Sequence, residues 1–228
     1  MNILVVAAHM DDAEIYAGGT LIKYSREGHK VFVCVCTNGN KGSHKYPPER
    51  LTEIRRCEQI EAAKAYGGEV FFLDYEDNLV IDCKQLRLDI IEATRKTAAD
   101  VLITHFPQDP SNDHKTIGKA VRDSIVGLKW GNMPVKSAPI AKAPLLLFMD
   151  TMAGVGFLPE IYVDISDVID LKRQAFLKHV SQVECDAEYG RCVEVLSEIR
   201  GMQNGTKYAE GFIAHKYPGG MLNYKLLP

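Results

Sequence analysis

Solid apolar runs separated by polar stretches recur along this chain of 228 residues. The runs do not alternate between apolar and polar positions, which is typical of strands in a parallel sheet that is covered on both faces. Predicted strands therefore span residues 3–8, 31–36, 70–73 and 101–104, and later apolar segments at 145–149 and 161–163 extend the same sheet.

Between these runs the apolar positions recur at helical spacing. The spacing predicts helices over residues 12–26, 48–66, 84–96, 114–126, 167–180 and 187–199. A succession of strand and helix of this kind favours an α/β fold, with a Rossmann-like, mostly parallel sheet and helices on both faces. At this length we expect one domain over residues 1–228.

Two connections are longer than is usual, at residues 37–47 and 127–144. Long loops in a compact domain are often functional, so we expect both to form walls of a ligand pocket.

The charge balance argues against two classes of partner. The 27 basic and 30 acidic residues give a net charge of −3 and are mixed along the chain. Without a long basic block, nucleic acid and anionic membrane are poor partners. No segment has the pattern of a signal peptide or a membrane span, so we expect a cytoplasmic protein. The six cysteines form no CxxC pair, and we expect them to be reduced thiols.

Acids and histidines follow the predicted strands at the points where the strands end. In an open α/β sheet, ligands bind beyond the carboxyl ends of the strands, so these residues share one rim. Those after the first and fourth strands are His9, Asp11, Asp12, His105, Asp109, Asp113 and His114. Imidazole and carboxylate are the groups that hold Zn²⁺ in catalytic sites, where three protein ligands leave one position open.

The geometry of the segment HMDD favours a shared ligand site. His9 lies at a strand end and Asp12 begins a helix, so one turn directs both toward a common point, with Asp11 beside it. His114 begins another helix and supplies a third ligand. Each segment alone also fits a plain alternative, in which Asp12 and Asp113 cap helices and His9 is a hydrogen-bonded histidine. The two segments at one rim together favour the metal.

The glycines of AGGT, Gly18 and Gly19, do not form a phosphate-binding loop. A dinucleotide fingerprint lies in the turn between strand and helix, whereas these glycines fall inside the predicted helix. We expect them to allow close packing of that helix against the sheet or a neighbouring segment.

The opening AAHMDDAEIYAGGTL resembles that of the LmbE-like, or PIG-L, deacetylases, zinc enzymes that remove an N-acetyl group from amino sugars and their conjugates. The resemblance continues, in the family's order, through RRCEQIEAAKAYGG, FFLDYED, ITHFPQDPSNDHKTIGKAV, VDISDVIDLKRQAFLKHVSQ and YAEGF. It implies zinc, or another divalent transition metal, held by His9, Asp12 and His114. It also implies a metal-bound water as nucleophile, with Asp11 as its general base.

The same resemblance implies roles for further residues. Arg55 corresponds to a substrate-binding position and Asp113 to a supporting one, although Arg55 also fits an exposed cation paired with Glu58. His179 fits either a catalytic role or a structural anchor of its helix. The implied partner is a small N-acetylated sugar or glycoconjugate, and the resemblance is compatible with a homo-oligomer.

Two residues depart from the family pattern. Met10 replaces a proline, which removes no reacting group. Ser111 replaces the first histidine of an HPDH motif, a position that assists the oxyanion or leaving group, and serine cannot carry positive charge there. Either His105, which we expect to contact the substrate, or His179 compensates for the missing histidine, or the protein acts on a different substrate or at a reduced rate. The alternatives are a metal hydrolase for another amide and a noncatalytic sugar-binding protein that retains the metal.

Overall fold

The computed structural model describes residues 1–184 and 189–216, and within them seven strands form one sheet. The sheet order is β3-β2-β1-β4-β5-β7-β6. The strands are β1 (Asn2–Ala7), β2 (Lys30–Thr37), β3 (Glu69–Tyr75), β4 (Val101–His105), β5 (Leu145–Met149), β6 (Ile161–Asp164) and β7 (Ala209–Ala214). Strands β1 to β5 pair in parallel, whereas β7 is antiparallel to both β5 and β6.

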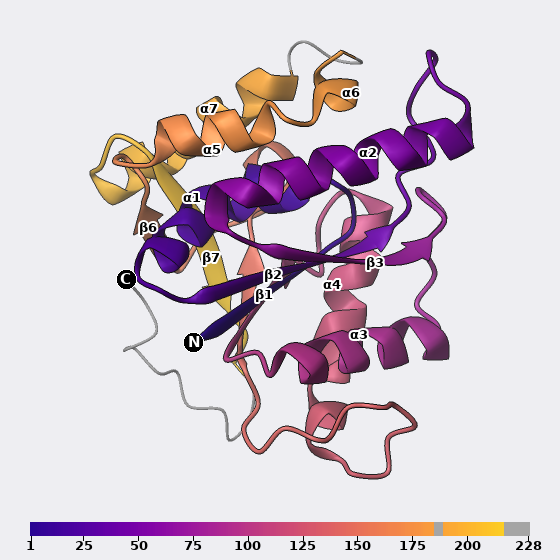
Figure 1. Ribbon diagram of the computed structural model, residues 1–228. Helices are drawn as coiled ribbons and strands as arrows, with labels where there is room; N and C mark the ends of the chain where they lie inside the picture. The colour runs from indigo at the N-terminus through magenta and orange to yellow at the C-terminus, as the bar shows by residue number, and fades with distance from the viewer. Residues whose placement is uncertain (185–188, 217–228) are drawn as a thin grey trace.

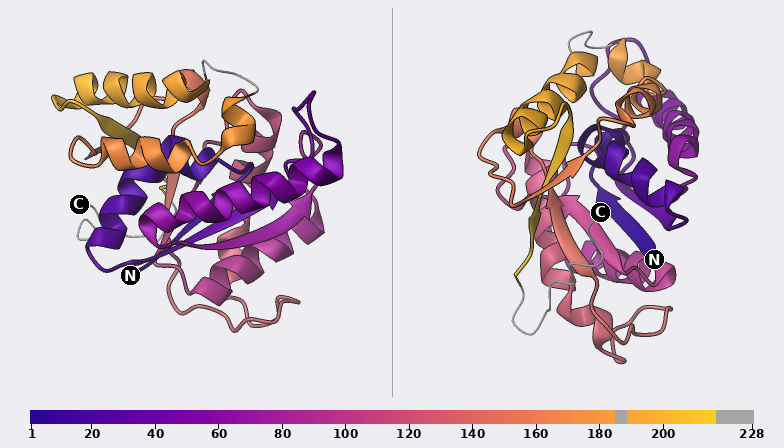
Figure 2. Two further views of the ribbon diagram at one scale, coloured as in Figure 1. Left: turned by 45° about the horizontal axis from the view of Figure 1, so that its top comes forward. Right: turned by 90° about the vertical axis from the view of Figure 1, so that its left-hand side faces the viewer.

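Helices cover both faces of this sheet (Figure 1). They are α1 (Asp12–Arg26), α2 (Pro48–Ala63), α3 (Lys84–Thr97), α4 (Asn112–Ser124), α5 (Ile169–Phe176), α6 (Val180–Val183) and α7 (Tyr189–Asn204), with 3₁₀ turns η1 (Lys64–Tyr66), η2 (Val126–Lys129) and η3 (Met152–Gly154). One apolar core lies between the sheet and α1, α5 and α7, and a second lies under α3 and α4. The helices that cover these two cores lie on opposite faces of the sheet (Figure 2). The predicted α/β fold with a mostly parallel sheet and helices on both faces is confirmed.

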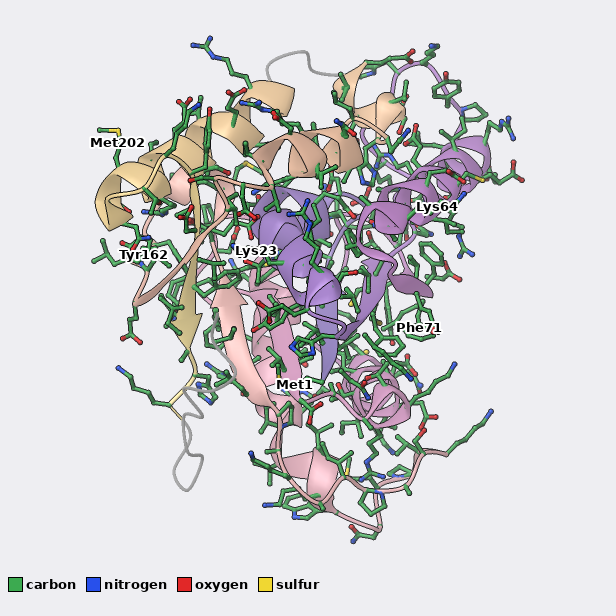
Figure 3. The ribbon with its side chains drawn as sticks, turned by 60° about the vertical axis from the view of Figure 1, so that its left-hand side comes forward. Met1, Lys23, Lys64, Phe71, Tyr162 and Met202 are labelled. Atoms are coloured by element: carbon green, nitrogen blue, oxygen red, sulfur yellow. The ribbon has the colours of Figure 1, made fainter. Side chains whose placement is uncertain are left out.

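Strand β7 was not predicted from the sequence. Its segment AEGFIA carries a glutamate and a glycine, which interrupt the apolar run by which the other strands were recognised. Glu210 is nevertheless buried, because it pairs with the buried amine of Lys172 at 2.7 Å. The strand lies between β5 and β6, so the far edge of the sheet is β6. Figure 3 shows Tyr162 of β6 and Phe71 of β3 at opposite sides of the molecule.

Three sequence predictions require correction or restriction. The helix predicted over residues 167–180 ends at Phe176, and α6 follows as a separate element. The helix predicted over 187–199 begins in residues outside the described part of the chain. The five cysteines in the described part are free, as expected, and Cys185 lies outside it.

The two long loops lie at opposite ends of the strands. The first follows β2 and reaches the rim at the carboxyl ends of the strands, where Asn38 N–H donates to the Tyr75 carbonyl oxygen. The second follows the last turn of α4 and leads into the start of β5. Arg95, at the end of α3, donates to its carbonyl groups at Gly127 and Trp130. The expectation that residues 127–144 form a pocket wall at the ligand rim is therefore wrong.

The two glycines of α1 allow close packing, as expected. A Cβ atom built on Gly19 would lie 2.6 Å from Cγ2 of Ile165. In the same turn, the backbone N–H groups of Gly19 and Thr20 donate to the Glu210 carboxylate, each at 2.8 Å. The glycines thus join α1 to the antiparallel part of the sheet. None of the described helices combines the length and apolar character needed to cross a bilayer.

Candidate metal centre

His9, Asp12 and His114 meet at the carboxyl rim of the sheet. His9 follows β1, Asp12 begins α1, and His114 lies in the first turn of α4. His9 Nδ1 lies 3.1 Å from His114 Nε2 and 3.5 Å from Asp12 Oδ2, and His114 Nε2 lies 3.3 Å from Asp12 Oδ1. The structure thus brings together the three residues that the sequence predicted as ligands, from segments about a hundred positions apart.

The spacing of these donor atoms allows one shared cation, because one atom from each residue lies within 4.8 Å of the others. Ligands about 2.0–2.1 Å from a zinc ion lie roughly 3.3 Å from one another, and His114 Nε2 lies near that distance from both His9 Nδ1 and Asp12 Oδ1. The donor set of two imidazoles and one carboxylate is also that of open catalytic zinc sites. Asp12 and His114 are buried, whereas the side chain of His9 is 21% exposed, so the site is reached from the side of His9.

Carboxylates support both imidazoles on the sides that face away from this centre. His114 Nδ1 lies 3.3 Å from Asp109 Oδ2. His9 Nε2 lies 3.2 Å from Asp113 Oδ2 and 3.3 Å from Asp77 Oδ1. Carboxylate partners of this kind fix the ring orientation and tautomer of a ligating histidine. The supporting position predicted for Asp113 is occupied in this way, and Asp77 and Asp109 are supporting residues to which no role was assigned from the sequence.

Two other groups of side chains also have donor atoms within 4.8 Å of one another, namely His105, Asp109 and His114, and His9, Asp77 and Asp113. In the first, His105 Nε2 already accepts the Ala8 N–H at 2.9 Å. In the second, both oxygens of Asp113 accept backbone N–H groups, from Asn78 at 2.7 Å and from Val80 at 3.3 Å. The backbone N–H of His9 donates to Asp12 Oδ2 at 2.6 Å and leaves Asp12 Oδ1 facing His114. The group of His9, Asp12 and His114 is therefore the best candidate.

His105 lies beneath the centre and is fully buried. Its ring stacks on that of His114, with centroids 3.9 Å apart, and its Nε2 lies 3.1 Å from Asp12 Oδ2. Burial, with the nearby His114, lowers the pKa of His105 to about 4, so the ring is neutral. A ring in this position packs against His114 and has no surface to offer a substrate, contrary to the contact expected from the sequence.

The surrounding charges set the protonation of the three candidate ligands in the absence of a cation. Burial lowers the pKa of His114, but the Asp12 charge and the bond to Asp109 raise it to about 9. Burial likewise acts against the charge of His9, and its bonds to Asp113, Asp12 and Asp77 outweigh it and raise the pKa. A cation that binds here displaces protons from the imidazoles, because a ligating nitrogen must be unprotonated.

Asp11 lies beside the three candidate ligands and is buried, with 1% of the residue exposed. Its φ of +132° is outside the usual range for a residue with a side chain. Strained conformations of this kind cluster at functional sites. Oδ2 accepts a hydrogen bond from Gln182 Nε2 at 2.8 Å, and the buried Oδ1 has no partner among the described residues. Burial, with the adjacent Asp12 charge, raises the pKa of Asp11 to about 6.

His179 is also fully buried, near Asp11. Its Nε2 lies 3.1 Å from Glu14 Oε2, while Glu14 Oε1 accepts hydrogen bonds from Gln59 and Tyr66. Burial lowers the pKa of His179, but Glu14 and the Asp11 charge together raise it above its ordinary value. Sequence reasoning missed Glu14 and Gln182, although both lie within the segments AAHMDDAEIYAGGTL and KHVSQ that carry the family resemblance.

Arg55 is buried, not an exposed cation paired with Glu58. It donates to the Gly39 carbonyl at 3.0 Å and to Gln182, and it lies 3.6 Å from Asp77. Glu58 instead accepts two hydrogen bonds from Ser181. Ser111 precedes α4 as its N-cap residue, but its hydroxyl makes no cap hydrogen bond to the helix.

The chain resembles known deacetylases over most of its length. It is 26% identical to diacetylchitobiose deacetylase from Thermococcus kodakarensis over 225 residues, covering 92% of this chain and 81% of that protein. The N,N'-diacetylchitobiose deacetylase structure from Pyrococcus horikoshii matches with a TM-score of 0.84 at 25% identity, covering 94% of this chain and 83% of that one.

A relative with another activity matches as well. It is 4-oxalmesaconate hydratase from Pseudomonas putida, which is 24% identical to this chain. The match covers 92% of this chain and 87% of that protein. The family model for PIG-L, GlcNAc-PI de-N-acetylase, matches residues 4–125. This match spans just over half of the chain and includes His9, Asp12 and His114, so the chain belongs to the PIG-L family.

Proposed function

We propose that this protein is a zinc-dependent amidohydrolase that removes an N-acetyl or short N-acyl group from an amino sugar or its conjugate. The observation that carries the proposal is the meeting of donor atoms from His9, Asp12 and His114, all within 4.8 Å of one another, beside a buried carboxylate, Asp11. Both deacetylases named above act on diacetylchitobiose by name, which supports an N-acetylated sugar as the substrate class. The activity belongs to a single domain that comprises residues 1–228.

His9, Asp12 and His114 are the residues that would hold the cation. When bound, it would lower the pKa of water and polarise the amide carbonyl oxygen. Asp11 is the general base: its Oδ1 has no partner among the described residues and accepts the proton of the attacking water. The same carboxyl group then donates that proton to the amine nitrogen as the C–N bond breaks. Burial raises the pKa of Asp11 above its ordinary value, which favours a carboxyl group that both accepts and returns a proton.

In this proposal Ser111 stabilises the oxyanion, and His179 supports the general base Asp11. The Ser111 hydroxyl, free of a capping bond, donates a hydrogen bond to the developing oxyanion. His179 lies on the side of Asp11 and Glu14, so it supports the charge on Asp11 and is the better placed of the two histidines to compensate for Ser111. Arg55 affects substrate binding through the loop after β2, because its guanidinium donates to the Gly39 carbonyl in that loop. Asp113 acts by fixing the position of His9.

A second candidate is the addition of water to a carbon–carbon double bond. The similarity to 4-oxalmesaconate hydratase over 92% of this chain favours it. The same base and cation site serve both reactions, so the substrate decides between them.

Acetate release tests the proposal. The purified protein is incubated with N-acetylglucosamine and diacetylchitobiose, with and without a chelator, and then with Zn²⁺ restored. We expect acetate that disappears with the chelator and returns with the metal. A protein that hydrates 4-oxalmesaconate and releases no acetate would instead establish the second candidate. Binding of the sugars without acetate would identify a noncatalytic sugar-binding protein.

A further inference from the structure

The carboxylate of Asp11 has a single hydrogen-bond donor among the side chains that the structure describes. That donor is Gln182 Nε2, at 2.8 Å from Oδ2, and it comes from α6, 171 positions later in the chain. The backbone of Asp11 is strained at a φ of +132°, so local structure alone does not favour the position of its carboxylate. A contact from outside α1 is therefore needed to hold it.

The orientation of the Gln182 amide is determined by its two partners. Its Oε1 accepts a hydrogen bond from Arg55 Nη2, while its Nε2 donates to Asp11. Guanidinium groups only donate and carboxylates only accept, so the reversed amide would place two donors and two acceptors face to face. Arg55 is itself 4% exposed and is held by the Gly39 carbonyl. It therefore keeps the donor end of the amide on Asp11.

Helix α6 is held against this part of the molecule by its neighbours. Ser181 donates through its backbone N–H and its hydroxyl to the Glu58 carboxylate, at 2.8 and 2.7 Å. At the end of the helix, Glu184 pairs with Lys45 of the loop after β2, at 2.7 Å. The Lys45–Glu184 pair is exposed and contributes little, so the contacts of Ser181 with Glu58 and of the buried His179 with Glu14 give the Gln182 amide a defined position.

We propose that Gln182 is the positioning residue of the general base: by occupying Oδ2 it fixes the plane of the Asp11 carboxylate and leaves Oδ1 free for proton transfer. This inference rests on the proposed function, in which Asp11 takes the proton of the attacking water. A carboxylate that rotates freely presents its basic oxygen in the reacting orientation for only part of the time, and such a loss reduces kcat without weakening substrate binding.

The test compares Q182M with Q203M in the metal-loaded enzyme. Methionine keeps the length and the apolar stem of glutamine but neither hydrogen bond, and Gln203 is an exposed residue of α7 that serves as the matched control. We expect Q182M to lower kcat for acetate release about tenfold, with KM and metal content unchanged. Q203M should retain the kcat of the original protein.

A crystal structure of Q182M supplies a readout that does not depend on activity. We expect the Asp11 carboxylate to rotate or to occupy two conformations, while His9, Asp12 and His114 stay in place. An Asp11 carboxylate that keeps its single position overturns the inference, and so does an unchanged kcat or a loss carried by KM or metal content. If the original protein releases no acetate, the proposed function fails, and the position of Asp11 in the crystal still decides the role of Gln182.

The role of Arg55 is tested by combining substitutions. If Arg55 acts on Asp11 through the Gln182 amide, the combined loss of kcat in R55K/Q182M is smaller than the product of the two single losses. Losses that multiply would show that Arg55 does not orient the amide.

Discussion

At the residue scale, two neighbouring carboxylates are suited to different tasks because their surroundings differ. Asp12 lies between His9, His105 and His114, and although burial opposes its charge, the adjacent histidines, and above all the charge of His114, hold its pKa well below the ordinary value. Asp11 faces one amide donor, and burial raises its pKa to about 6. One carboxylate is thus kept ionised for a cation, and its neighbour is suited to gain and lose a proton.

D11N tests this division directly. Asparagine has nearly the same shape and tolerates an unusual φ, but it cannot accept a proton. We expect kcat for acetate release to fall by roughly 10²–10⁴-fold while the bound metal, measured by elemental analysis, stays at the original level. H114A is the matched variant and should lose both metal and activity. Full activity in D11N would contradict the role of Asp11.

The departure at Ser111 gives a second prediction. The serine hydroxyl makes no capping bond, so S111H costs α4 no cap, and the new imidazole can carry positive charge near the oxyanion. We expect kcat on simple N-acetyl sugars to rise by up to about tenfold. Steady-state kinetics on N-acetylglucosamine measure it. A large fall in kcat would show that the pocket around Ser111 is shaped for a different group.

At the scale of the elements, the sequence predicted the parallel part of the fold and both segments that carry the candidate ligands. Strands β1, β2, β4 and β5 are continuous apolar runs, a pattern that is local in the sequence. Because ligands bind beyond the carboxyl ends of parallel strands, the sequence also placed His9, Asp12 and His114 together. The rest depends on contacts that are distant in sequence. The burial of Glu210 needs Lys172, and the role of Gln182 needs Arg55, so neither could be seen along the chain.

The glycine pair of α1 gives a prediction at this scale. In an isolated helix, replacing glycine by alanine stabilises by about 1 kcal/mol. At Gly19 the new methyl group would lie 2.6 Å from Ile165, so we expect G19A to lower the free energy of unfolding by roughly 1–3 kcal/mol through overpacking. Urea denaturation measures it.

G131A is the control for this substitution. Gly131 lies in the loop after η2, and a Cβ atom there would meet nothing within 4 Å. The free energy of unfolding of G131A should change by no more than about 0.5 kcal/mol. A G19A variant as stable as G131A would show that Ile165 yields and that close packing at Gly19 is not required.

At the scale of the whole molecule, buried ion pairs join the antiparallel edge of the sheet to the helices that cover it. Arg200 of α7 contacts Asp150, directly after β5, through two hydrogen bonds of 2.6 and 2.9 Å. Lys172 of α5 and Glu210 of β7 form a second buried pair. Breaking a buried pair leaves an uncompensated charge, whereas an exposed pair contributes little.

R200M should therefore lower the free energy of unfolding by about 3–5 kcal/mol, because Asp150 stays buried without its partner. K216M removes the exposed Lys216–Glu160 pair, at 2.9 Å, and should cost well under 1 kcal/mol. Thermal and urea denaturation of the two variants provide the comparison. Equal, small losses would mean that the Asp150–Arg200 pair does not hold α7 to the sheet.

The central claim is that His9, Asp12 and His114 hold one cation beside Asp11. Anomalous diffraction at the zinc absorption edge, from crystals grown with Zn²⁺, locates the ion without reference to activity. We expect one peak about 2.0–2.2 Å from His9 Nδ1, His114 Nε2 and an Asp12 oxygen. A peak between His9 Nε2, Asp77 and Asp113, or no peak at this rim, would contradict the claim.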